Sequence, residues 1–495
     1  MMRSLEPKVP SLFAYNVSLE RRVPADHPLR PIKQALELSF VGPAVKHTYG
    51  RSGNPSVPPE VIVRMLFLLF YYNIPSEREL SEQIGLRLDF LWFLDLDLES
   101  AVPNHSVLSK ARARWGTEIF EQLFTRTVRQ CVQAGLVDGQ LLHVDSTIVA
   151  ANASKDSVLS GGAELVSALR EAYAQQEQKL APEPGEPTAA APKSKRGRVN
   201  ATHVSPTDPD AQLARDKSGV TRLAYKEHRL VDDTHGVITA VVSSAAQVAD
   251  GTQLPPLHEQ HLANTALKLG GVALAGDKHY GTADNFRYCR ERGLCAHLGI
   301  AVNGVVGRGL FPLDKFVYEA AQDRFRCPGG HVLVLHQRRA ESNVNDYLIE
   351  HAEHCQNCPL RAQCTRSKNG RSLQVAGDQA LLQVDWAQAR SPAAQYSRRR
   401  RQHVMEGSFA DAANNHGSKR ARWRRHWRQQ IQSWLIAAVQ NLRLLIKHGG
   451  KNQPTIGVAC LQRQLGRLVW LQKPLPPRCW ARCLPAYKPW TPISA

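Results

Sequence analysis

The sequence has no apolar run long enough to cross a membrane. Its longest run, from Met65 to Tyr72, is far shorter than the ~20 residues that a membrane-spanning helix needs. The stretch that begins at Met1 also lacks the apolar segment of a secretory signal peptide. We therefore predict a cytoplasmic protein. In that compartment the ten cysteines are expected to be thiols or metal ligands rather than disulfides.

Acidic residues are scarce as well. The 495 residues include 44 Asp and Glu against 63 Lys and Arg, which gives a formal net charge of +19. Such an excess favours a polyanionic partner, and charge alone leaves nucleic acid and an anionic membrane surface as candidates. Hydrophobic residues make up 43% of the chain, which is enough for ordinary globular cores. The length leaves room for roughly two to four domains.

Helix signals dominate the N-terminal part of the chain. Residues 1–50 are polar and contain several prolines, and we expect them to be irregular. Pro58 suits the first turn of a helix, and Ser76 is placed to cap the next one. Two further helices are predicted for residues 107–116 and 117–134. The sequence therefore predicts an all-helical domain here.

We place this helical domain at residues 1–136. Arg112 and Arg114 would give it a basic face. A helix-turn-helix DNA-binding unit is one interpretation, and a plain helical bundle with a solvated charged face is the other. Pattern alone favours the plain bundle, because small helical units are common and no clear recognition helix is visible.

A buried strand is predicted for Leu141–Ala150, with one carboxylate, Asp145, at its centre. A carboxylate inside an apolar run is expensive to bury unless something pairs with it. A divalent cation is the simplest partner, because hard cations bind carboxylate oxygens. The alternative is a turn in which Asp145 hydrogen-bonds its own backbone.

Strands and helices alternate after this strand. Three antiparallel strands followed by strand–helix–strand units describe a ribonuclease-H-like sheet, so we predict an α/β catalytic core at residues 137–300 and 381–448. A linker-like insertion interrupts this core at 155–215. The expected elements are a helix at 163–180, a hairpin of strands 222–231 and 237–242, a helix at 255–268, a strand at 271–276, a helix at 282–292 and a strand at 295–300.

Two more carboxylates are candidates for the same site. Asp277 directly follows a short apolar strand, and open α/β sheets carry their sites at strand ends. Its alternative role is to cap the following helix. Glu406 lies on a predicted helix among many cations, and its alternative role is a surface ion pair with a nearby arginine.

A cysteine-rich insertion is predicted at residues 301–380. Its cysteines follow the spacing C-x27-C-x2-C-x5-C, and in a reducing compartment this spacing favours a tetrahedral zinc site over an iron–sulfur cluster. Free buried thiols are the alternative. The candidate ligands are Cys327, Cys355, Cys358 and Cys364, any one of which His331, His351 or His354 could replace.

Basic residues surround Glu406, and a basic tail follows at residues 449–495. Trp423 and Trp427 could stack on bases, although we expect at least one to pack on the core. The basic surface would bind phosphates largely without regard to sequence. Its candidate DNA-binding residues are Arg399, Arg401, Lys419, Arg420, Arg422, Arg424 and Arg425.

Three widely spaced acids on a basic frame suit phosphodiester chemistry. Two Mg²⁺ ions (or Mn²⁺) held ~4 Å apart can stabilise the attacking and the leaving oxygen of an in-line displacement. Asp145 would bridge both ions, while Asp277 would bind one and Glu406 the other. The substrate would be double-stranded DNA, attacked by water or by a DNA 3′-hydroxyl.

The chain resembles the DDE transposases of bacterial insertion sequences, in particular the group with a cysteine-rich insertion before the catalytic Glu. The order and spacing of the motifs carry this resemblance over residues 45–445. The matching stretches are Tyr49–Pro55 with the helices after it, His143–Thr147 with Ala151–Ser154, Gly276–Thr282, Cys355–Cys364, and Glu406–Asp411 with His416-Gly and Arg420-Ala-Arg422.

The resemblance implies a Mg²⁺-dependent enzyme that cleaves DNA and transfers strands, with an N-terminal region that binds terminal inverted repeats. It implies the same triad, a bacterial nucleoid location and a homodimer or higher oligomer on DNA. Related families carry Arg four residues before the catalytic Glu and Lys seven after it, where this chain has Gln402 and Ala413. A decayed copy that only binds DNA, or a ribonuclease-H-like nuclease, therefore remains an alternative.

Overall fold

The computed structural model describes residues 17–50, 56–178, 199–215, 219–267, 270–300, 309–377 and 379–449. The chain divides into two units, residues 1–450 and 451–495. The predicted basic tail lies outside the described residues except for Gly449, and so does the part of the predicted linker at 179–198. No helix of the described residues is long and apolar enough to span a membrane.

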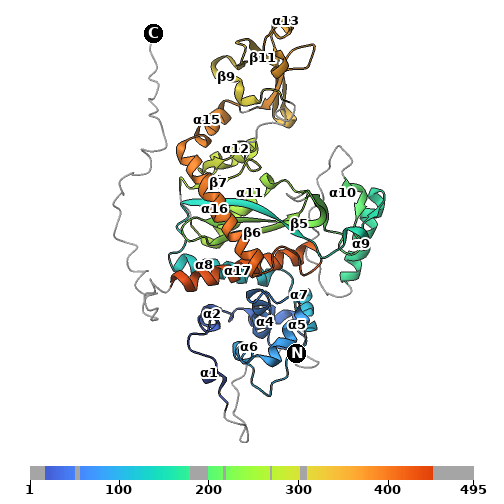
Figure 1. Cartoon of the computed structure of the whole chain (residues 1–495), viewed down its shortest axis with the longest axis vertical. Helices are drawn as coiled ribbons and strands as arrows, with labels where there is room; N and C mark the ends of the chain where they lie inside the picture. The colour runs from blue at the N-terminus through green and yellow to red at the C-terminus, as the bar shows by residue number, and fades with distance from the viewer. Residues whose placement is uncertain are drawn as a thin grey trace, which may run out of the picture. The chain divides into compact units, whose positions relative to one another are not determined.

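Helices form the whole described N-terminal region, as the sequence predicts (Figure 1). Ser76 caps its helix as expected, because its hydroxyl accepts the N–H of Glu79 at 3.1 Å. The expectation that residues 1–50 are irregular was wrong in part, since short helices lie at 19–22, 29–35 and 41–48, and the second of them buries Leu29 and Ile32. The helices are α1 (Leu19–Arg22), α2 (Leu29–Ala35), α3 (Val41–Val45), α4 (Pro59–Tyr71), α5 (Glu77–Leu86), α6 (Leu88–Phe93), α7 (Ser106–Trp115) and α8 (Glu118–Gln133).

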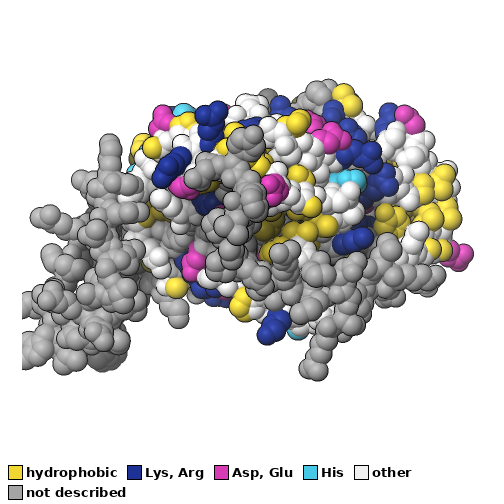
Figure 2. All heavy atoms as spheres, turned by 90° about the horizontal axis from the view of Figure 1, so that it is seen from below, with side chains coloured by type: hydrophobic (Ala, Val, Ile, Leu, Met, Phe, Trp, Pro, Cys, Tyr) yellow, Lys and Arg dark blue, Asp and Glu magenta, His cyan; other side chains and the backbone are white. Residues whose placement is uncertain are grey.

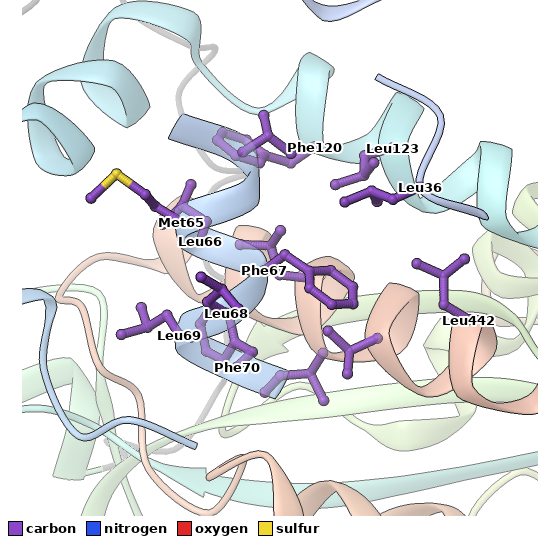
Figure 3. Packing of buried hydrophobic residues seen from close by; sticks show 14 of the residues in the cluster. Leu36, Met65, Leu66, Phe67, Leu68, Leu69, Phe70, Phe120, Leu123 and Leu442 are labelled. Atoms are coloured by element: carbon purple, nitrogen blue, oxygen red, sulfur yellow. The ribbon is translucent and has the colours of Figure 1, made fainter. Parts of the chain in front are cut away.

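The helical region and the end of the chain share one apolar core. Helix α4 is buried on all sides because nearly every residue from Val61 to Phe70 is apolar. It packs with α8 against the long helix α17 (His426–Gly449). Figure 3 shows side chains of α4, Phe120 of α8 and Leu442 of α17 in this cluster. Burial of these apolar surfaces ties the N-terminal helices to the C-terminal one.

A mixed sheet forms the middle of the molecule. Its strands run in the order β4-β5-β1-β7-β8, and β6 pairs with β5. The β1–β5 and β5–β6 pairs are antiparallel, whereas β1–β7 and β7–β8 are parallel. The predicted strands are present, and β4 was not predicted. The bounds are β1 (Leu141–Ala150), β4 (Gln212–Arg215), β5 (Thr221–Asp232), β6 (Ile238–Ala245), β7 (Ala273–Gly276) and β8 (Cys295–Leu298).

Helices cover both faces of this sheet. Leu142, Val144 and Leu230 form one core with α11 (Leu254–Thr265) and α12 (Ala283–Glu291). The alternate residues of β1 and β5 face α16 (Pro392–Asn415) and α17, as the contacts of Asp145 with α16 show. Helix α15 (Gln379–Ala389) precedes α16 and packs on β8. The described chain is therefore of mixed α/β class with a helical N-terminal region, as predicted.

Two smaller parts complete the described chain. One is an antiparallel sheet in the order β13-β12-β11-β10-β9, with its own buried core that includes Phe325 and Tyr347. Its elements are β9 (Val317–Glu319), β10 (Arg324–Arg326), β11 (Val332–Arg339), β12 (Val344–Ile349), α13 (Ala352–Gln356), α14 (Arg361–Cys364) and β13 (Ser372–Ala376). The other consists of β2 (Leu159–Ser160), α9 (Ala163–Gln178), α10 (Val199–Thr202) and β3 (His203–Val204).

Candidate active site

Asp145 and Asp277 lie close together at one edge of the central sheet. The parallel register of β1 and β7 pairs His143 with Ala275, and each aspartate follows two residues later, Asp145 still inside β1 and Asp277 directly after the end of β7. Asp145 lies inside β1 rather than in a turn, so the turn alternative was wrong, although its Oδ1 does accept the N–H of Ser146 at 2.8 Å. Two predicted site residues are thus side by side because two strands pair.

Opposing effects set the pKa of the Asp145 carboxyl. Burial raises this pKa, and the nearby charge of Asp277 adds to the effect. The guanidinium of Arg401, which pairs with Asp145 from α16, acts in the opposite direction. A cation beside Asp145 therefore stabilises the charged form of a half-buried carboxylate.

Asp277 begins a tight turn after β7. Its Oδ1 accepts the N–H of His279 at 2.8 Å, whereas α12 is capped by Thr282, so the helix-cap alternative for Asp277 was wrong. The chain passes very close to this turn at Gly299, where a Cβ atom would lie 2.9 Å from the carbonyl carbon of Asp277. Only glycine allows that approach. Gly299 is therefore a sequence feature of this site that the sequence analysis did not identify.

Glu406 lies on α16, which packs over β1, β7 and β8. Its side chain is exposed, and its Oε1 accepts a hydrogen bond from Gln402 at 3.1 Å. Across the described ranges, no three His, Cys, Asp or Glu side chains are arranged closely enough to hold a metal ion. The structure therefore brings Asp145 and Asp277 together and places Glu406 on the adjoining helix without joining it to them.

A second polar link joins α16 to the sheet. His143, two residues before Asp145, is fully buried, and its Nε2 lies 2.8 Å from Asp233. Arg400 of α16 donates to the same oxygen of Asp233 at 2.8 Å. Burial lowers the pKa of His143, which favours a neutral imidazole. Adjacent arginines of α16 thus bind two carboxylates, Arg400 that of Asp233 in the turn after β5 and Arg401 that of Asp145 on β1.

The four predicted cysteine ligands line one small cavity in the smaller antiparallel sheet, together with His331 and His354. A Cβ on Gly329 would lie 3.2 Å from the Sγ of Cys358 and 3.6 Å from that of Cys327, so this glycine allows a tight turn around the thiols. Burial raises the pKa of the Cys364 thiol to about 11, with the other three thiols adding to the rise. None of the seven described cysteines forms a disulfide.

Two family models match the chain. A model described as a transposase domain matches residues 17–114, which cover the N-terminal helices through most of α7. A model described as a transposase DDE domain matches residues 326–446, which include the four cysteines and Glu406. Both matches support a resemblance of this chain to DDE transposases. Asp145 and Asp277 lie between the two matched ranges.

The other comparisons are weaker. One solved structure that is similar to this chain is a piggyBac transposase synaptic complex with hairpin DNA. The match covers 90% of this chain and 86% of that chain, with 8% sequence identity and a TM-score of 0.32. A similarity at this level carries no argument about fold or function. No curated protein matches the sequence.

Several of the predicted DNA-binding residues have partners inside the protein. Arg112 is only 3% exposed, pairs with Glu77 and lies 3.9 Å above the ring of Trp423. Arg422 donates to backbone oxygens near the end of α4 and stacks on Phe70, and burial lowers its pKa to about 10. These contacts hold the C-terminal basic stretch against the N-terminal helices. We leave Arg112 and Arg422 out of the DNA-binding surface for this reason.

The remaining basic residues are more accessible. Ala150, the last residue of β1, donates its N–H to the carbonyl of Lys419 at 2.9 Å and accepts the N–H of Ala421 at 2.7 Å. This pairing holds Lys419 and Arg420 at the end of the strand that carries Asp145. Figure 2 shows further Lys and Arg side chains gathered in separate groups on the face seen from below. The exposed members of the predicted set are Arg114, Arg399, Lys419, Arg420 and Arg424.

The tryptophans of the basic stretch pack inward. Trp423 meets Phe70 edge to face and donates its Nε1–H to Glu77 at 3.0 Å. Trp427 also packs against the large apolar core. The expectation that at least one of them packs on the core is therefore confirmed.

Arg425 is bound by two aspartates of the insertion, Asp208 and Asp210. The contribution of Asp208 to stability depends on pH. Asp208 accepts the hydroxyl of Tyr225 at 2.7 Å and the backbone N–H of Arg425 at 3.1 Å, while Asp210 pairs with the Arg425 side chain at 3.0 Å. Burial raises the pKa of Asp208 from 3.8 to about 6. Between pH 3.8 and about 6, Asp208 stays protonated in the folded protein while it loses its proton in the unfolded chain. The free energy of unfolding therefore falls as the pH rises through this window, and above it Asp208 lowers the stability by a constant amount.

The variant Asp208→Asn is expected to raise the free energy of unfolding at neutral pH by up to about 3 kcal/mol, because the amide keeps the hydrogen bonds and cannot ionise. Urea unfolding at several values between pH 4 and pH 7.5 measures this. Stability attributable to Asp208 should fall through the window in the wild type and stay level in the variant. Equal pH dependence in both proteins would show that Asp208 ionises normally.

Proposed function

We propose that this transposase binds the terminal inverted repeats of its insertion sequence and catalyses Mg²⁺-dependent cleavage and strand transfer of double-stranded DNA. One observation carries the proposal: Asp145 on β1 and Asp277 directly after the parallel strand β7 lie close together, under the helix that bears Glu406. The strand order, with β6-β5-β1 antiparallel and β1-β7-β8 parallel, supports a ribonuclease-H-like core.

The domain limits proposed for the transposase follow the same plan. Residues 1–136 would be the DNA-binding helical domain, 137–300 and 381–448 the catalytic core with its insertion at 155–215, 301–380 the cysteine-rich insertion, and 449–495 the basic tail. Synapsis of two DNA ends requires two sites, so a homodimer or higher oligomer on DNA is part of the proposal.

The chemistry of the donors fits divalent cations. Asp145 and Asp277 present carboxylate oxygens, which are the ligands that Mg²⁺ and Mn²⁺ prefer. The ion pair of Asp145 with Arg401 supports the assignment, since it places positive charge beside this carboxylate. Two such ions, when bound, would stabilise the attacking and leaving oxygens of an in-line displacement.

The chain's own residues would do the rest of the work. Asp145, Asp277 and Glu406 would hold the ions, and Arg401 would leave Asp145 when an ion binds there. Lys419 and Arg420, held at the end of β1, would bind phosphates of the DNA close to the cleaved bond. Arg114, Arg399 and Arg424 would extend this contact over the accessible surface.

The test of the proposed function is cleavage of a labelled duplex that carries the element's own end, with Mg²⁺, by wild type and by Glu406→Gln. We expect cleavage by the wild type and a loss of at least ~10²-fold in the variant, because a ligand of a catalytic metal contributes several kcal/mol to the transition state. Joined products would separate a transposase from a simple nuclease.

One alternative has an observation in its favour. Gln402 occupies the place where related families have an arginine, and it binds Glu406 directly. If neither protein cleaves while both bind the DNA end, the chain is a DNA-binding relic. Equal cleavage by both proteins would remove Glu406 from the proposed triad.

A further inference from the structure

A buried ion pair lies on the strand that pairs with the one carrying Asp145. Arg229 and Glu227 of β5 are 0% and 1% exposed, and the Nε of Arg229 donates to the Oε1 of Glu227 at 2.6 Å. In the antiparallel register Arg229 lies directly opposite Asp145. Residues opposite each other point to the same face of a sheet, so Arg229 extends toward the side where Arg401 meets Asp145.

Arg229 contacts α16 just beyond Glu406. Its Nη1 donates to the hydroxyl of Ser408 at 2.9 Å and to the Ser408 carbonyl at 3.3 Å, and its guanidinium lies 4.9 Å from the ring of Phe409. Gln440 of α17 accepts from the same Nη1 at 2.9 Å and donates to the Ser408 carbonyl at 3.0 Å. One side chain thus joins β5, α16 and α17.

This ion pair is a poor choice if its purpose is stability alone. Two charges must lose their water when they are buried, and apolar residues of similar size often serve stability as well or better. The Nη2 atom of Arg229 even lacks a hydrogen-bond partner, which adds to the cost. The pair instead orients the groups around it, because a guanidinium holds several hydrogen-bond partners at set angles.

The links between α16 and the sheet lie on both sides of Glu406. Arg400 binds Asp233 before it in the sequence, and Arg229 binds Ser408 after it. Arg401 adds a third link for as long as it pairs with Asp145. A helix fixed at both ends of a stretch of about two turns is held against sliding and rotating relative to the strand. The side chain between the two links then has a set position relative to Asp145.

We propose that Arg229, held in place by Glu227, is a positioning residue that fixes α16 so that Glu406 can bind metal together with Asp145 and Asp277. The inference rests on the proposed function, because it assumes that Glu406 is a metal ligand. Arg229 acts through Glu406 and touches neither DNA nor metal. Groups that orient a ligand typically change metal affinity by roughly 10- to 100-fold when they are removed.

The test is a mutant cycle read out as Mn²⁺ affinity of the full-length protein, measured from the electron paramagnetic resonance signal of free Mn²⁺. The variants are Glu227→Met/Arg229→Met, Glu406→Gln and the combination of all three. The double variant removes both charges, so no unpaired charge stays buried. We expect it to weaken Mn²⁺ binding by roughly tenfold or more, and we expect Glu406→Gln to add nothing to that loss.

Non-additivity separates positioning from a general loss of structure. If the losses of the double variant and of Glu406→Gln add up, Arg229 does not act through Glu406 and the inference is overturned. If Glu406→Gln weakens binding and the double variant does not, the inference fails while the proposed metal site stands. If Glu406→Gln itself binds Mn²⁺ like the wild type, the proposed role of Glu406 fails and the inference with it.

Two further proteins complete the experiment. Arg290→Met/Asp385→Met removes an ion pair between α12 and α15, and as a matched control it should keep wild-type affinity. Ser408→Ala covers the case in which the double variant does not fold, because it removes only one acceptor of Arg229 and leaves a good helix residue. We expect Ser408→Ala alone to weaken Mn²⁺ binding by less than the double variant does, and to have no further effect in a protein that already carries Glu406→Gln. An equal loss of Mn²⁺ affinity in that protein would contradict the inference.

Discussion

Replacing Asp145 by asparagine is expected to lower the rate of Mg²⁺-dependent DNA cleavage by roughly 10³-fold, while binding of a DNA end stays unchanged. A divalent cation contributes several kcal/mol to the transition state of phosphodiester cleavage, and each 1.4 kcal/mol corresponds to about tenfold in rate. The substitution keeps the size of the side chain and removes its charge. Single-turnover cleavage of a labelled duplex measures the rate, and a gel-shift titration measures binding.

Asp145 should show the largest effect of the three carboxylates. It is the proposed ligand of both ions, it lies near Asp277, which follows β7, and it pairs with Arg401 on α16. The control is Asp284→Asn, since Asp284 is exposed on α12, seven residues after Asp277, and takes no part in the proposed site. Cleavage by Asp145→Asn within a few-fold of the wild type would rule out the proposed mechanism.

Substituting Cys355 by serine is expected to unfold the sheet β9–β13 and to remove one bound zinc per chain. Structural zinc sites contribute roughly 10–16 kcal/mol of apparent binding free energy at neutral pH, and much of this becomes folding free energy. This sheet has only a small apolar core of its own, so it has little else to rely on. Metal analysis of the purified protein measures zinc, and amide hydrogen exchange over residues 309–377 measures folding.

The matched control for the cysteine variant is Cys295→Ser, because Cys295 is a half-buried cysteine on β8 and does not line the cavity of the four cysteines. We expect this variant to keep its metal and its exchange pattern. A wild-type protein without zinc, with slow exchange over the same residues, would mean that the four cysteines are buried thiols. Iron in place of zinc would indicate an iron–sulfur cluster.

The carboxylates show how much of the site the sequence predicts. Asp145 was identified because a carboxylate interrupts an apolar strand, and Asp277 because it ends one. That they lie side by side follows from the parallel pairing of β1 with β7, which joins segments more than 130 residues apart. The cost of burying a charge points to a partner without naming it, and here Arg401 of α16 is the partner that the fold supplies.

Arginine roles were the least predictable feature. Arg112 and Arg114 are two residues apart in a basic stretch, yet one is buried on Trp423 and the other is exposed on the surface. No sequence feature distinguishes Arg229 and Glu227, because one charged pair within an alternating strand has the same pattern as charged residues on a solvent-exposed edge strand. Whether such a side chain meets water or another helix depends on which elements pack over it.

The sequence by itself determined the local structure of the chain and which residues could take part in a reaction. Periods of 2 and 3.6 in apolar residues, together with caps such as Ser76, act between neighbours in the chain, so they can be read without a fold. Only the tertiary structure decided which charges meet: Asp145 with Arg401, and Arg229 with Glu227 and Ser408. Those contacts depend on strand order and on how α16 and α17 lie over the sheet, and burial between distant segments, rather than local preference, sets that arrangement.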